Sequence, residues 1–66
     1  MITPEDAYRS AHVLLRDHGE AAGTLATQRA DQLFIRGDFI GEQTWLSILA
    51  AIEELRRPRR TGDTVH

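Results

Sequence analysis

Residues Arg36-Gly37-Asp38 (RGD) lie in the middle of this 66-residue chain, between two stretches with helical periodicity. Each residue suits a helix boundary. Arginine is favoured in a last turn, glycine adopts the left-handed conformation that follows it, and aspartate caps the next helix. The same tripeptide is a cell-adhesion ligand in secreted proteins, but the N-terminal residues have no signal-peptide pattern. We therefore interpret these three residues as a turn between helices.

The stretch after this turn predicts a helix over about residues 39–57. Its apolar residues recur every three or four positions, which is the strongest periodic signal in the chain. The stripe consists of Trp45, Ile48, Leu49, Ile52 and Leu55. Pro58 ends the helix, because the residue before a proline avoids helical angles.

The stretch before the turn predicts two more helices, over about residues 4–18 and 20–36. Thr3 is the expected N-cap of the first, and Gly19 follows its last residue. Their stripes consist of Ala7, Tyr8, Ala11, Leu14, Leu15 and His18 in the first helix and of Ala22, Leu25, Ala26, Arg29, Ala30, Leu33 and Phe34 in the second.

The predicted fold class is therefore all-α, a three-helix bundle with short turns. Residues 1–57 form the domain, and residues 58–66 are expected to be a flexible, disordered tail rich in arginine. Short connections favour antiparallel neighbours, either as an up-down-up bundle or as a helical hairpin with the third helix packed across it. Equally tight turns also occur between steeply crossing helices.

Composition narrows the possible classes of protein. Hydrophobic residues make up 41% and charged residues 27% of the chain, as in a globular domain, and there is no cysteine. The longest apolar run is far shorter than the roughly 20 residues of a membrane span. We expect a cytoplasmic protein without membrane attachment.

The charge is unevenly distributed, with a net charge of −5 over residues 1–55 and +3 over residues 56–66. The candidate nucleic-acid contacts are Arg56, Arg57, Arg59 and Arg60. Four positive charges support only weak, non-specific phosphate binding, and the acidic body opposes it. Nucleic-acid association is therefore the alternative function.

The sequence offers no pattern for catalysis, a cofactor or a metal. His12 and His18 are six positions apart, so one helix face does not present both as ligands. No cysteine is present, and neither serine of the predicted helices has an activating motif. We expect no enzymatic activity. Arg29 lies on an apolar stripe, where it either packs its stem or contacts an anion or partner.

Several large apolar residues fall outside the predicted stripes, or at their margins, and three short helices do not enclose them all. The candidate interaction surface consists of Val13, Phe39, Ile40 and Leu46, with Ile35 as a further off-stripe residue. Small domains gain stability by associating. The sequence therefore predicts a protein–protein interaction module that binds a protein partner or itself as a homodimer.

A resemblance accompanies this interpretation and covers roughly residues 7–57. It rests on His18-Gly19, Ala22, Arg29, Gly37-Asp38, Trp45, Ile48, Ala51-Ile52 and Leu55. This pattern resembles a family of short alphaproteobacterial proteins of unknown function. The resemblance implies an all-helical fold and assigns no activity.

Overall fold

The computed structural model describes residues 2–57, and the predicted tail, residues 58–66, lies outside the described residues. The described chain has an all-α compact fold. Its elements are helix α1 (Pro4–His18), a 3-10 turn η1 (Gly19–Ala21), helix α2 (Ala22–Ile35) and helix α3 (Phe39–Arg56).

The connection between α1 and α2 differs from the predicted turn. α1, η1 and α2 follow one another without an intervening residue, so residues 4–35 form one bent helical segment and residues 39–56 form a second. Gly19, with φ 56° and ψ −125°, ends α1, and its N–H donates to the carbonyl of Leu15. No side chain caps α2, and the N–H of Ala22 donates to Gly19 within the 3-10 turn. α2 therefore begins two residues later than predicted.

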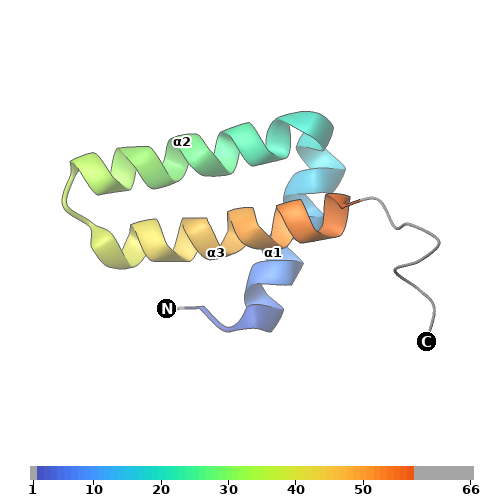
Figure 1. The fold of residues 1–66 in the computed structure, drawn as a ribbon, viewed down its shortest axis with the longest axis horizontal. Helices are drawn as coiled ribbons and strands as arrows, with labels where there is room; N and C mark the ends of the chain where they lie inside the picture. Colours follow the sequence, from blue (N-terminus) through green and yellow to red (C-terminus); the bar gives the residue numbers. More distant parts are fainter. Residues whose placement is uncertain (1, 58–66) are drawn as a thin grey trace.

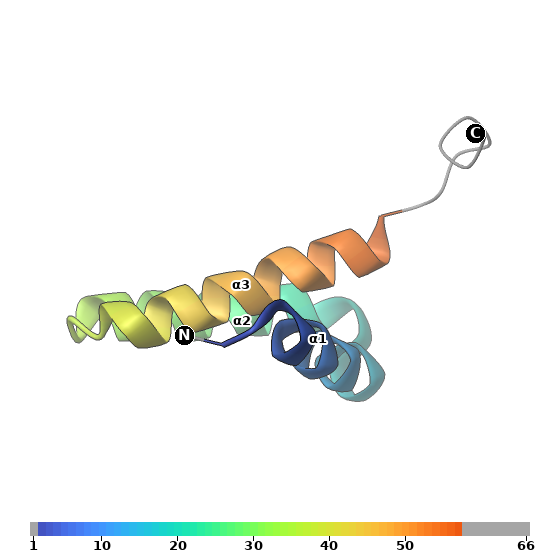
Figure 2. The same ribbon diagram turned by 90° about the horizontal axis from the view of Figure 1, so that it is seen from below.

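The three helices form a hairpin with one helix across it. α2 and α3 lie side by side and run in opposite directions, and α1 crosses the hairpin steeply (Figure 1). Figure 2, turned by 90°, shows α1 nearly end-on against one side of this two-helix layer. The all-α class is therefore confirmed, whereas the three helices of the predicted bundle are two helical segments, of which the first is bent.

The turn between α2 and α3 confirms the interpretation of Arg36-Gly37-Asp38. Gly37 has a φ of 78°, and its N–H donates to Phe34 while the N–H of Asp38 donates to Leu33. These two bonds are the Schellman pattern that closes a helix C-terminus. The Asp38 carboxylate then accepts from the N–H of Gly41 and caps α3.

The core is small and consists mostly of alanine. The buried residues are Ala7, Ala11, Ala22, Ala26, Ala30, Ile48, Ala51 and Ile52. Ile52 is the largest side chain that is fully buried among the described residues. The alanine stripe of α2 lets the backbones of α2 and α3 approach closely, because a methyl group takes little room between helices. The predicted stripe residues Phe34, Leu55, Arg29 and His18 are exposed instead.

Candidate protein-interaction surface

Large apolar side chains gather at the end of the hairpin, around the turn between α2 and α3. The group consists of Phe34 and Ile35 at the end of α2 and of Phe39 and Ile40 at the start of α3, and we call these four residues the tip patch. Their exposed fractions are 57% for Phe34, 82% for Ile35, 60% for Phe39 and 69% for Ile40. Single exposed apolar residues are normal, but a group of large ones at one place marks a site of interaction.

The geometry of the tip patch follows from the turn. The Schellman closure brings the end of α2 next to the start of α3, so the rings of Phe34 and Phe39 lie with centroids 6.1 Å apart at an interplanar angle of 56°. Aromatic pairs prefer such tilted arrangements. The two rings therefore stabilise one another while both remain accessible to a partner.

The structure divides the four predicted interaction residues among different places. Phe39 and Ile40 belong to the tip patch. Val13 lies on α1, where it lines an apolar groove of about 400 Å³ together with Trp45. Leu46 lies on α3, two turns after Phe39, with an exposed fraction of 38%.

Sequence reasoning misplaced one residue of the tip patch. Phe34 continues the helical stripe of α2 and was therefore expected in the core. Leu33, in the same turn, is partly buried, whereas Phe34 lies at the edge of the stripe, on a side of α2 that no described element covers. In the sequence, two large apolar residues stand on each side of the turn, Phe34-Ile35 before it and Phe39-Ile40 after it. This arrangement is the signal that indicates the patch.

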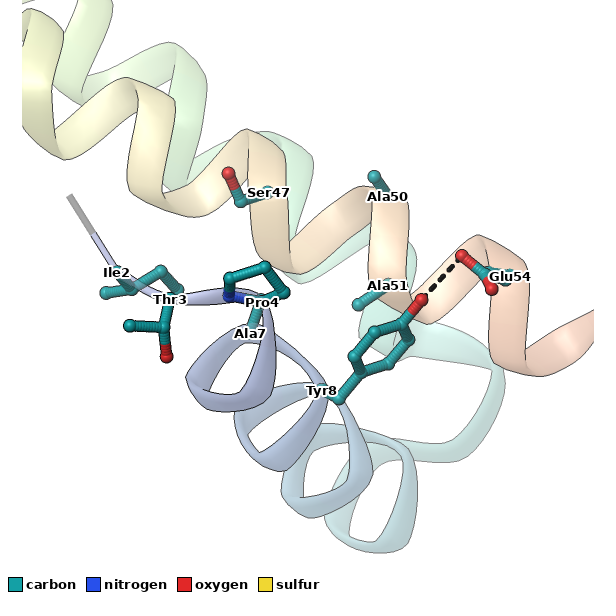
Figure 3. A pocket seen from close by; sticks show the side chains of 9 residues that line it. All are labelled: Ile2, Thr3, Pro4, Ala7, Tyr8, Ser47, Ala50, Ala51 and Glu54. Atoms are coloured by element: carbon teal, nitrogen blue, oxygen red, sulfur yellow. Dashed lines mark hydrogen bonds between the residues drawn. The ribbon is translucent and has the colours of Figure 1, made fainter.

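A cleft of about 250 Å³ lies between the start of α1 and the second half of α3 (Figure 3). The Tyr8 hydroxyl donates a hydrogen bond of 2.7 Å to the Glu54 carboxylate and links the two helices. This hydrogen bond, with a smaller effect of desolvation and of the Glu54 charge, raises the pKa of Tyr8 above its ordinary value. A phenol held in its protonated form acts here as a hydrogen-bond donor between elements.

The other candidate residues from the sequence do not come together at one site in the described part of the chain. Arg56 donates to the carbonyl of Glu20 at 3.4 Å, and Arg57 is exposed. Arg59 and Arg60 lie outside the described residues. Arg29 makes no ion pair with any described residue, and Trp45 is partly buried against the core.

Residues 2–57 contain no group of three or more histidine, aspartate or glutamate side chains placed to hold a metal ion. Within the same residues, no helix has the length and apolar character needed to cross a membrane.

Comparisons of the chain with known protein families, with curated proteins and with solved structures found no match. The resemblance to a family of short alphaproteobacterial proteins stays a prediction.

Proposed function

We propose that residues 1–57 form a three-helix domain that acts as a non-enzymatic protein–protein interaction module through the tip patch. One observation carries the proposal. Four large apolar side chains are more than half exposed at one end of the hairpin, and two of them are aromatic. Aromatic anchors at the centre of a surface supply most of the binding free energy in protein interfaces.

The small core supports the same function. Ile48 and Ile52 are the only buried residues larger than alanine in the described part. Leaving aromatic side chains in water while the core is filled with methyl groups costs stability in a free monomer. Burial of the tip patch by a protein would recover about 25 cal/mol for each Å² of apolar surface.

The test of the proposal is to capture proteins from a nuclease-treated cell lysate on the immobilised full chain. The bound proteins are then identified by mass spectrometry. Ile35→Asp and Phe39→Asp are the test variants, and Thr24→Asp, an exposed position near the other end of α2, is the control. We expect a stoichiometric protein that the control retains and both test variants lose.

Two results would contradict this function. Capture that persists in Ile35→Asp and Phe39→Asp would remove the tip patch from the interaction. Capture that occurs only when nuclease is omitted, and that is lost on deletion of residues 58–66, would favour the alternative of a nucleic-acid-associated accessory protein that uses Arg56, Arg57, Arg59 and Arg60.

A further inference from the structure

One broad face of the α2–α3 hairpin has no covering element in the described chain. α1 packs against the opposite face, where its residues line clefts with Trp45, Ile48 and Ala51 of α3 (Figure 2). Phe39, Leu46 and Glu53 are seven residues apart along α3, so they share a face that points away from these contacts. We call this side of the hairpin the open face.

The open face has a projection at one end. Phe34 lies seven residues after Thr27 and eleven after Gly23, so these three residues share one side of α2. The ring of Phe34 lies beside that of Phe39, and both rings are more than half exposed. The aromatic pair therefore projects from the open face next to the turn.

The same face has a hollow at its other end. This hollow has a volume of about 580 Å³ and lies between the start of α2 and the end of α3. Its lining residues are Gly23, Thr27, Leu49, Ile52, Glu53, Arg56 and Arg57. Gly23 lacks a side chain, and the nearest atom to a Cβ at this position would be Leu49 Cδ1 at 3.9 Å. The hollow is therefore open above the α2 backbone.

We propose that two copies of this chain pair through their open faces in antiparallel orientation, so that the Phe34–Phe39 pair of each copy occupies the hollow of the other. A two-fold axis across the middle of the hairpin exchanges its two ends. The axis therefore places the aromatic pair of each copy over the hollow of the other copy. This is the closed, isologous arrangement that homodimers favour. The inference rests on the proposed function and names the partner of the tip patch.

The size of the open face fits a small, weak dimer interface. α3 has 18 residues and α2 has 14, so the two helices are about 27 Å and about 21 Å long, and each is about 10 Å wide. Each copy thus offers roughly 480 Å², before side-chain relief is counted, which is less than the roughly 800 Å² per partner of a standard interface.

The charges along the open face also fit the antiparallel orientation. Asp31, Asp38 and Glu42 outnumber Arg36 towards the turn. Arg56 and Arg57 outnumber Glu53 in the lining of the hollow. Rotation about the two-fold axis brings the acidic end of one copy to the basic end of the other. The guanidinium groups also come close to the aromatic rings, which attract cations.

A second copy fits the open face better than the chain's own terminus does. Val65 is the only residue of 58–66, other than proline, with an apolar aliphatic side chain. Residues 58–66 therefore offer little apolar surface to the partly exposed Leu49 side chain in the hollow.

Sedimentation of the purified full chain from about 1 μM to about 1 mM tests the association. We expect a concentration-dependent shift to twice the chain mass of 7.4 kDa. Leu46→Glu, on the open face, should raise the dissociation constant at least about tenfold. Leu55→Glu is the matched control, because Leu55 and Leu46 both lie on α3 and are both 38% exposed, and it should leave the constant unchanged.

Cross-linking tests the orientation, because the chain has no cysteine of its own. Phe39→Cys and Glu53→Cys are mixed under mild oxidation. We expect the mixed disulfide to form faster than either self-linked product, since antiparallel copies place residue 39 of one beside residue 53 of the other. The Glu53→Cys copy of the mixed dimer keeps its Phe34–Phe39 pair. The cross-link also decides the orientation independently of whether Leu46→Glu folds.

A folded chain that sediments as a monomer over the whole range would overturn the dimer. Tip-dependent capture of a different protein would in that case leave the proposed function standing, whereas its absence would remove both. Rapid self-linking of Phe39→Cys, with no mixed product, would show that the turns of the two copies meet and would overturn the antiparallel seating.

Discussion

Gly37 adopts a φ of 78°, in the left-handed region that residues with a Cβ rarely occupy. Nothing lies within 4 Å of a Cβ built at this position, so the backbone conformation alone resists substitution. Gly23 is the opposite case. Its backbone is helical, and an added methyl group would only touch Leu49.

We therefore expect Gly37→Ala to lower the free energy of unfolding by about 1–2 kcal/mol, the cost of a left-handed conformation for an L-residue. Gly23→Ala should instead raise it by up to about 1 kcal/mol, because alanine is the better helix former. Urea unfolding followed by circular dichroism measures both. Equal effects of the two substitutions would mean that the turn is not strained for residues with a Cβ.

The hydrogen bond from Tyr8 to Glu54 predicts a pH dependence with a definite sign. It favours the protonated phenol in the folded state, so the pKa of Tyr8 is raised relative to the unfolded chain. Its contribution to stability is complete below the unfolded pKa of about 10 and is lost as the pH rises through the folded pKa.

Tyrosinate absorbance measures this titration directly, because Tyr8 is the only tyrosine. We expect Glu54→Gln to lower the pKa of Tyr8 towards its ordinary value, since it removes both the charged acceptor and its repulsion of tyrosinate. Glu53→Gln is the control and should change the titration little. An unchanged pKa in Glu54→Gln would show that the bond does not persist in solution.

At the scale of the elements, the helix ends with a capping residue were predictable, whereas the uncapped start of α2 and the packing of the helices were not. Thr3, Gly37 and Asp38 act within one turn of the chain, so residue type and position determine their roles. Phe34 shows the limit. Helical spacing indicates which residues share a face, but only the tertiary arrangement determines whether another element covers that face.

The start of α3 permits a test of how a cap and a neighbouring glycine depend on one another. A Cβ at Gly41 would come within 2.7 Å of the Asp38 carboxylate that caps the helix. Gly41→Ala gains helix propensity and displaces the cap, so we expect little net stabilisation. In an Asp38→Ala background, which itself costs about 1 kcal/mol, the same substitution should stabilise the helix by up to about 1 kcal/mol.

Thermal unfolding of the four chains in this double-mutant cycle gives the coupling free energy. If Gly41→Ala raised the free energy of unfolding equally in both backgrounds, the two effects would be independent. The Asp38 side chain would then move aside without losing its hydrogen bond.

At the scale of the whole molecule, a small core explains why the tip patch and the open face matter. Among residues 2–57, six of the eight buried residues are alanine, and each buries little surface. The stripes predicted which helix faces turn inward, since Ala7, Ala11, Ala22 and Ile48 are buried as expected. The steep crossing of α1 was not predictable from periodicity, because the same stripe serves an antiparallel and a crossing neighbour.

Ile52 is expected to be the side chain on which the folded state most depends. It is fully buried between α2 and α3, and no described side chain of similar size is buried as deeply. Ile52→Ala should cost about 2–5 kcal/mol from lost burial and the cavity left behind. Domains have about 0.05–0.15 kcal/mol of stability per residue, so this loss reaches the total at the lower end of the range for 66 residues, where the mostly alanine core places this chain. We expect Ile52→Ala to be largely unfolded by circular dichroism at 25 °C, whereas Leu55→Ala, on the same helix but 38% exposed, stays folded and loses less. Similar losses from both would indicate that the interior of the hairpin does not depend on one side chain, and that the buried alanine stripe alone holds α2 against α3.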